Sequence, residues 1–200
     1  MLKTIHLPSF AVIGKEGSTK EGPDFIKKLI EESSSSFSEV SHLGKKNEDG
    51  SFSGFCGLMS DFSRQFKPWE NGFSEGLYLF GVECPLETAA PKGWVKWVAP
   101  EHDYLVKEVT PETYQDTFKS MVYYQIPLNA YKLAGACFDY SDPKTNKSYI
   151  YFPVVPNPLK PKKECLIDKI EPCSCHCAYC FFDECGGVWE QKRFLLYGRL

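Results

Sequence analysis

Residues 10–30 read FAVIGKEGSTKEGPDFIKKLI and carry the pattern on which the fold prediction rests. The apolar run Phe10–Gly14 has the length of a short strand. Gly22-Pro23-Asp24 then predicts the start of a helix, because proline suits the first helical position and an acid in the first turn complements the helix dipole. After it, apolar residues recur at helical spacing, with lysines and glutamates on the other side. The stretch therefore predicts a strand followed by an amphipathic helix.

The same order of elements occurs a second time further along the chain. Thr110-Pro111-Glu112 supplies a helix cap, a proline and an acid, and apolar residues follow it at helical spacing up to Gln125. The remaining strands are predicted at residues 54–59, 76–83, 104–109, 133–140 and 148–154. We therefore expect an α+β fold, a duplicated βαββ repeat that forms one mainly antiparallel sheet with helices on one face, plus a small Cys-rich tail.

A proline-rich stretch divides the chain. Four prolines fall within residues 153–161, where they fix φ and remove backbone donors, so neither a helix nor a central strand can continue. We expect a body over residues 1–154, a semi-rigid linker over 155–163 and the Cys-rich tail over 164–200.

The composition excludes some classes of function. The formal charge is −3, so the chain has no overall attraction to nucleic acid or to an anionic membrane. No run approaches the length of a membrane span, and the first residues lack the apolar core of a signal peptide. A cytoplasmic protein that contacts neither membrane nor nucleic acid directly is the expectation. Aromatic residues reach 15%, which is more than a small core needs.

Three phrases in this order resemble the GyrI-like family, the effector-binding domains of bacterial transcription activators. They are Val12-Ile13-Gly14 followed by Gly22–Leu29, then Gly81-Val82-Glu83, and then Pro100–Val106, with Tyr149–Val154 similar to the last strand of the family. The resemblance covers residues 3–155. It implies a pocket between the two repeats, lined by aromatic side chains, with a glutamate that faces the ligand. Tyr149 stands where many members have a second glutamate, so a site with two glutamates is not expected here.

Under this resemblance Glu83 is the expected ligand-facing glutamate. An ionised carboxylate among apolar walls favours a cationic or hydrogen-bond-donating ligand, and aromatic faces add cation–π attraction. The candidate aromatic lining is Trp69, Trp97, Tyr104, Tyr149 and Tyr151, together with Phe66 and Trp94. A surface glutamate at a strand end and ordinary core aromatics are the alternative interpretation.

The leading functional prediction is a protein that binds amphipathic or cationic small molecules, for sensing or for sequestration. Two alternatives from other classes remain. One is a hydrolase that opens strained, electrophilic small molecules with pocket glutamates, and the other is a gyrase-inhibitor-like protein with a protein partner. Both come from the family resemblance, and no catalytic residue is assigned. An enzyme needs a second proton-transfer group beside Glu83, whereas a binding protein needs only the charge and the aromatic walls.

The nine cysteines fall into two groups. Cys56, Cys84 and Cys137 lie far apart within apolar runs, which predicts buried free thiols. The other six crowd into the tail, where the pair Cys177 and Cys180 has the spacing of a zinc knuckle. Two more ligands could come from Cys165, Cys173, Cys175, Cys185 or His176, and the set that we expect is Cys173, Cys177, Cys180 and Cys185. Disulfides formed after purification and reactive free thiols are the alternatives.

Element analysis of the full chain purified under reducing conditions tests the zinc prediction. We expect about one zinc per chain, because a tetrahedral site uses four soft ligands. Replacing Cys177 and Cys180 by serine in one double variant should remove the metal. Metal-free protein with every tail thiol open to titration would contradict the prediction.

Overall fold

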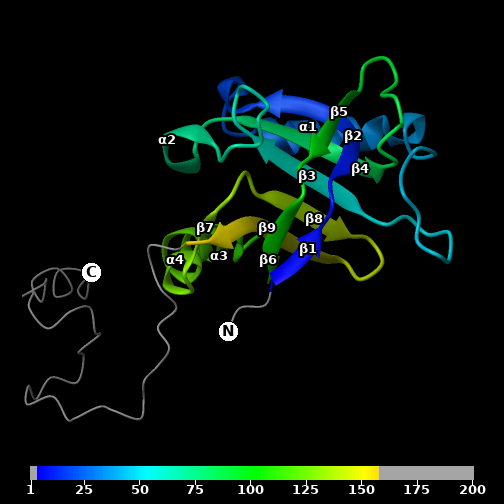
Figure 1. Cartoon of the computed structure of the whole chain (residues 1–200). Coiled ribbons are helices and arrows are strands. Elements are labelled where there is room, and N and C mark those ends of the chain that lie inside the picture. Colours follow the sequence, from blue (N-terminus) through cyan, green and yellow to red (C-terminus); the bar gives the residue numbers. More distant parts are fainter. Residues whose placement is uncertain (1–3, 158–200) are drawn as a thin grey trace, which may run out of the picture. The chain divides into compact units, whose positions relative to one another are not determined.

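The computed structural model describes residues 4–157 (Figure 1). Its strands are β1 (Thr4–Leu7), β2 (Phe10–Ser18), β3 (Phe55–Ser60), β4 (Leu77–Cys84), β5 (Val95–Ala99), β6 (His102–Val109), β7 (Tyr131–Leu133), β8 (Phe138–Asp142) and β9 (Lys147–Pro156). Its helices are α1 (Phe25–Ser35), α2 (Glu70–Phe73), α3 (Tyr114–Ser120) and α4 (Ile126–Leu128), with the short turns η1 (Thr19–Glu21) and η2 (Phe37–Glu39) and the π-helical turn η3 (Met121–Gln125). Nearly all of the predicted linker and the whole predicted tail lie outside the described residues.

The body is built from two copies of one motif, as the sequence predicts. The first copy is β2–α1–β3–β4 and the second is β6–α3–β8–β9. In each copy the last strand lies in the middle, since β4 pairs with β2 and β3, and β9 pairs with β6 and β8. β3 and β8 pair antiparallel and join the copies at a seam, where Gly57 lies opposite Asp139. The α+β fold with a duplicated βαββ repeat is confirmed.

The short strands β1 and β5 bring the two outer edges of the sheet together. β1 pairs with β6, where Leu7 lies opposite His102, and β5 pairs with β2, where Phe10 lies opposite Ala99. The pairing of β1 with β6 and the pairing of β2 with β5 follow one register, which continues across Pro8 and Pro100. Each repeat therefore begins with one long strand, β1–β2 or β5–β6, that is bent at a proline. Because β2 and β6 are the outer strands of the two repeats, these pairings make the sheet curl back on itself (Figure 1).

The inside of the curled sheet is filled by side chains. Buried Val12, Leu58, Trp97 and Tyr104 belong to one cluster there. The ring of Phe138 on β8 lies 5.2 Å from the ring of Phe10, on a strand that is not its neighbour in the sheet. Such contacts across the interior leave it as a packed core rather than a binding cavity.

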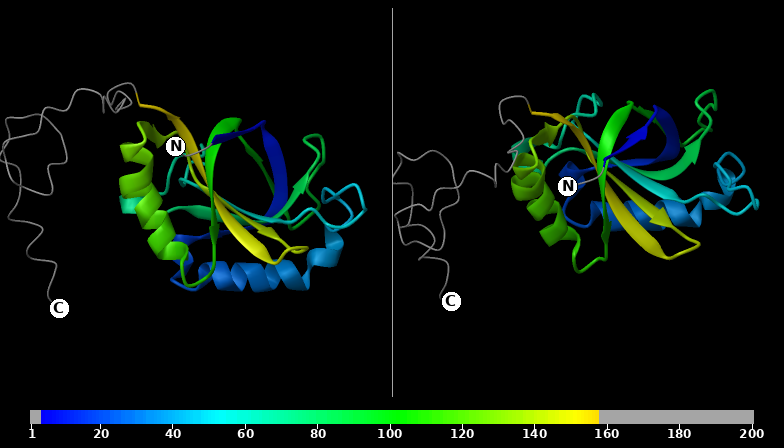
Figure 2. Two further views of the ribbon diagram at one scale, coloured as in Figure 1. Left: turned by 90° about the horizontal axis from the view of Figure 1, so that it is seen from below. Right: turned by 60° about the horizontal axis from the view of Figure 1, so that its bottom comes forward.

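The other face of the sheet carries both long helices, as the sequence predicts (Figure 2). Phe25 and Leu29 of α1 pack on Tyr78 of β4, while Met121 and Ile126, at the end of the second helical stretch, pack against β6 and β9. Gly17 of β2 lets α1 approach closely, because a Cβ there would lie 3.1 Å from the Phe25 ring. Within the part of the chain that the structure describes, no helix has the length and apolar character needed to cross a membrane.

Candidate ligand-binding site

A groove runs between α1 and α3 over the seam where β3 meets β8. It contains a cavity of about 190 Å³ at the end nearer Pro111. The walls come from both repeats, since Ile30 of α1 lies on one side and Pro111, just before α3, lies on the other. The cavity is lined by Ile30, Phe55, Gly57, Tyr78, Phe80, Val109, Thr110, Pro111, Tyr114, Asp139, Ser141, Ser148 and Tyr149. Its surroundings are therefore mainly apolar and aromatic.

One carboxylate lies on the floor of this cavity and is held by two phenol hydroxyls. The Tyr78 hydroxyl donates to Asp139 Oδ2 over 2.9 Å, and the Tyr114 hydroxyl donates to Oδ1 over 2.9 Å. The three side chains come from β4, β8 and the first turn of α3, so the bridge joins the two repeats. Asp139 is the only charged residue of the cavity lining, and no basic side chain within residues 4–157 pairs with it.

The surroundings of Asp139 make its charge costly. Desolvation raises the pKa of the carboxyl to about 6, although the hydrogen bonds from Tyr114 and Tyr78 act in the opposite direction. Burial, with the nearby negative charge of Asp139, raises the pKa of both tyrosines, so they stay neutral donors. At neutral pH the cavity therefore holds an anionic group whose side-chain partners among the described residues are two neutral hydroxyls.

A glycine makes this arrangement fit. Gly57 of β3 lies opposite Phe80 on one side and Asp139 on the other. A Cβ at this position would lie 1.8 Å from the Tyr78 hydroxyl oxygen. Any side chain at residue 57 would push Tyr78 away from Asp139, so the glycine creates the space that the bridge occupies.

Aromatic rings form the wall on the α1 side. The rings of Phe55 and Phe80 are stacked, with centroids 5.7 Å apart and planes at 11°. The thirteen lining residues include three tyrosines besides these two phenylalanines. Stacked ring faces beside a carboxylate suit a flat or cationic organic group.

A second cavity of about 110 Å³ continues the groove on the other side of Tyr114. Its lining includes Ile26 of α1, Met59 of β3 and Phe118 of α3, and it also includes Trp69, one of the residues expected from the sequence. The Trp69 indole N–H donates to the Leu77 carbonyl over 2.9 Å, which fixes the ring at the cavity wall.

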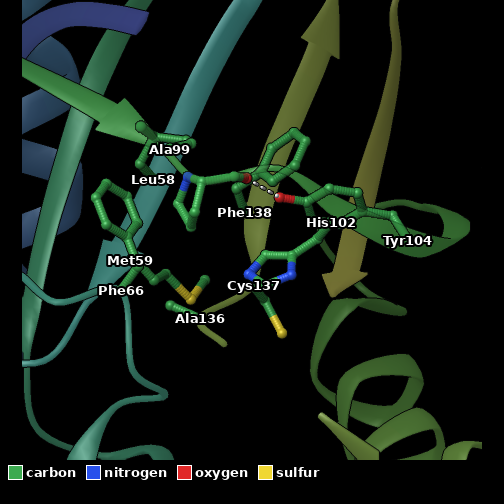
Figure 3. Close-up of a pocket in the computed structure, with 10 residues that line it drawn as sticks. Leu58, Met59, Phe66, Ala99, His102, Tyr104, Ala136, Cys137 and Phe138 are labelled. Atoms are coloured by element: carbon green, nitrogen blue, oxygen red, sulfur yellow. Dashed lines mark hydrogen bonds between the residues drawn. The ribbon is translucent and has the colours of Figure 1, made fainter. Parts of the chain in front are cut away.

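The interior of the sheet offers far less room. A cavity of about 10 Å³ remains at one end of it, beside His102, Tyr104 and Phe138 (Figure 3). The Tyr104 hydroxyl donates to the Pro100 carbonyl over 3.4 Å, shown by the dashed line in Figure 3. Burial lowers the pKa of His102, which favours its neutral form. This space is of the size that one water needs, so it cannot take an organic ligand.

The residues expected from the sequence are distributed over three places. Tyr149 lines the larger groove cavity and Trp69 the smaller one. Trp97, Tyr104 and Tyr151 lie in the interior cluster with Phe66, and Trp94 belongs to another core cluster. The structure brings none of these interior aromatics to the groove.

Glu83 lies outside the groove cavities and has a partner of its own. Lys45 Nζ donates to Glu83 Oε1 over 2.8 Å, and the Lys45 backbone N–H donates to the Glu83 carbonyl over 2.7 Å. The Glu83 side chain is 27% exposed. Its charge is compensated before any ligand arrives, in contrast to that of Asp139.

The predictions for the two groups of cysteines have different outcomes. Cys56, Cys84 and Cys137 are buried free thiols, which confirms the prediction for them. The predicted zinc ligands Cys173, Cys177, Cys180 and Cys185 lie outside the described residues. Within residues 4–157, no group of three or more His, Cys, Asp or Glu side chains has the arrangement of a metal site.

Sequence reasoning missed the three residues of the bridge. Asp139 stands in the strand phrase Cys137-Phe138-Asp139-Tyr140, where an acid between aromatic residues on a strand is unusual. That acid was the one signal in the sequence that could have indicated a site at this position. Its pairing with Tyr78 and Tyr114 could not be read from the sequence, because it depends on the register of β3 against β4 and β8.

Comparisons with known proteins identify the fold. No family model matches the sequence, and no curated protein matches it. The solved structure of SAV2435 bound to tetraphenylphosphonium has a TM-score of 0.52 and 17% identity, covering 78% of this chain and 94% of that one. The C-terminal domain of EcmrR has a TM-score of 0.55 and 13% identity, covering 78% and 98%. The integron cassette protein VCH_CASS2 from the mobile metagenome of Vibrio cholerae has a TM-score of 0.50 and 17% identity, covering 77% and 95%.

These similarities, together with the duplicated βαββ repeat, show that the body has the fold of the GyrI-like effector-binding domains. The sequence identities are low, so the similarity concerns the fold. The site itself has to be argued from the residues of this chain.

The cost of the Asp139 charge gives a prediction about stability. The folded-state pKa lies above the ordinary value of 3.8, so folding favours the protonated form, and stability falls as the pH rises from about 4 through 6. In the variant Asp139→Asn the side chain is an amide, which carries no charge at any pH. We expect the variant to melt higher than wild type by about 5 °C at pH 8, with a smaller difference at pH 5.

Thermal unfolding of both proteins across this pH range measures the effect. Glu83→Gln is the matched control, since its carboxylate is ion-paired and the same pH-dependent gain is not expected there. If Asp139→Asn is less stable than wild type at pH 8, the carboxylate stabilises the folded protein and the prediction is wrong.

Proposed function

We propose that this protein binds amphipathic organic cations in the groove between α1 and α3, with Asp139 as the counter-charge. The observation that carries the proposal is the anionic Asp139 on an aromatic floor, bonded only to neutral hydroxyls. Among the described residues, nothing cationic offsets it. A cationic ligand would supply the missing partner, and the stacked rings of Phe55 and Phe80 would hold its apolar part.

The fold supports the same conclusion independently. SAV2435, which shares it, has been solved with tetraphenylphosphonium, an aromatic cation. In this chain the filled interior directs an organic ligand to the groove, where the two cavities together offer the space. We infer that the protein acts as an effector-type binding protein that senses or sequesters such compounds.

Binding of tetraphenylphosphonium by isothermal titration calorimetry tests the role of Asp139. We expect Asp139→Asn to weaken binding by about tenfold or more, because a charge-assisted contact in a partly buried site contributes roughly 1.5–3 kcal/mol. Glu83→Gln should bind as wild type does, since Glu83 is paired with Lys45 outside the groove. The reverse pattern, with Glu83→Gln impaired and Asp139→Asn intact, would move the site to the residue that the sequence suggested.

The pH profile of the same binding gives a second prediction. Only the ionised Asp139 attracts a permanent cation, so affinity should rise with pH up to about 6 and level off above it. Below that midpoint the affinity should fall toward that of the uncharged variant Asp139→Asn, a decrease of about tenfold or more in total. The slope should be absent in Asp139→Asn. An affinity that is constant between pH 5 and 8 in wild type would exclude a carboxyl of raised pKa from the site.

A further inference from the structure

The two groove cavities lie end to end along the same elements. Ile30 of α1 lines the larger one, and Ile26, one helical turn earlier, lines the smaller one. On β3, Gly57 belongs to the larger cavity and Met59, the next residue on the same face, to the smaller one. The alternation of a strand and the turn of a helix thus place both cavities side by side over the same face of the sheet.

Tyr114 separates them. Among the described residues it is the only one that lines both cavities. It is the first residue of α3, and its ring crosses the groove to reach Asp139 with a 2.9 Å hydrogen bond. Tyr78 reaches the same carboxylate from the sheet but lines only the larger cavity.

The two tyrosines differ in their freedom to move. Tyr78 is 4% exposed, and its hydroxyl fills the space that Gly57 leaves open. Tyr114 is only partly buried; it packs against the cluster that includes Val109 and Met121, and it stands at the helix start beside both cavities. A ligand that competes for Asp139 can therefore displace Tyr114 at less cost than Tyr78.

The sizes of the cavities decide what each can hold. A cavity of roughly 150 Å³ accepts a benzene-sized ring. The larger cavity, at about 190 Å³, exceeds that volume, whereas the smaller one, at about 110 Å³, falls short of it and needs Tyr114 to turn aside before it can take a ring. The carboxylate of Asp139 lines the larger cavity and is bonded to Tyr114, which lines both cavities.

We propose that the two cavities are halves of one ligand groove and that Tyr114 is its gate, which selects monocations carrying an aromatic ring on each side of the charge. Such a ligand places one ring in each cavity. Its cationic centre lies at Asp139, where it takes the position of the Tyr114 hydroxyl. A cation with one ring fits the larger cavity without moving Tyr114. This inference rests on the proposed function and assigns it a ligand class and a specificity-determining residue.

Two permanent cations that differ by one ring test the gate, benzyltrimethylammonium and dibenzyldimethylammonium. Their dissociation constants are measured at pH 8, where Asp139 is ionised, for wild type, Tyr114→Phe and Tyr78→Phe. In Tyr114→Phe the two-ring cation no longer has to break a hydrogen bond to a carboxylate. We expect its affinity to improve by about tenfold relative to that of the one-ring cation.

Tyr78→Phe is the matched control, because it removes the other hydrogen bond to Asp139 and leaves the Tyr114 side chain in place between the two cavities. It should change both affinities by the same factor. A 19F label on Tyr114 in the otherwise unaltered chain reports the gate directly, and its signal should shift with the two-ring cation and stay in place with the one-ring cation.

The outcomes separate the two proposals. If Tyr114→Phe changes both affinities equally and the 19F signal responds to both cations alike, the gate is wrong. The proposed function then still stands, provided that Asp139→Asn weakens both cations. If wild type binds neither cation, the gate and the proposed function are both overturned.

Discussion

The hydrogen bonds from Tyr78 and Tyr114 to Asp139 determine what this groove can do. They hold a carboxylate at the seam between the two repeats, where aromatic walls make its charge costly. A protein selected for stability alone would place a neutral residue there or pair the acid with a lysine, as Glu83 is paired with Lys45. A costly charge without a cationic partner, placed in a cavity, is typical of a ligand-binding site.

The closure of the sheet explains why the sheet interior has little room for an organic ligand, which is one reason to propose the groove instead. β1 and β5 join the outer strands of the two repeats, so the sheet curls and its inner face fills with side chains. The helices then cover the opposite face and leave the space over the β3–β8 seam. Because α1 belongs to one repeat and α3 to the other, a ligand in the groove contacts both halves of the body.

The sequence predicted the fold well because its signals are local. Proline and acid after Gly22, and Thr110-Pro111-Glu112, mark both helix starts, and apolar runs mark the long strands. β1 and β5 escaped prediction because each is short and is separated by a proline from the strand that follows it. The single strand predicted over 133–140 was also wrong, since β7 ends at Leu133 and β8 begins only at Phe138. The site was harder to predict, since it depends on register. Shifting a strand by one residue exchanges its faces, so which acid and which aromatics reach the groove is decided by pairings across the sheet. Glu83 and Asp139 look alike in the sequence, and only the pairing separates them.

A crystal structure of the full chain soaked with tetraphenylphosphonium tests the central claim most directly. We predict that the phosphonium lies between α1 and α3, above Asp139, with at least one phenyl ring against Phe55 and Phe80 and the sheet interior unchanged. A ligand held inside the curled sheet, or one beside Glu83 with Asp139 still bonded to both tyrosines, would contradict this claim.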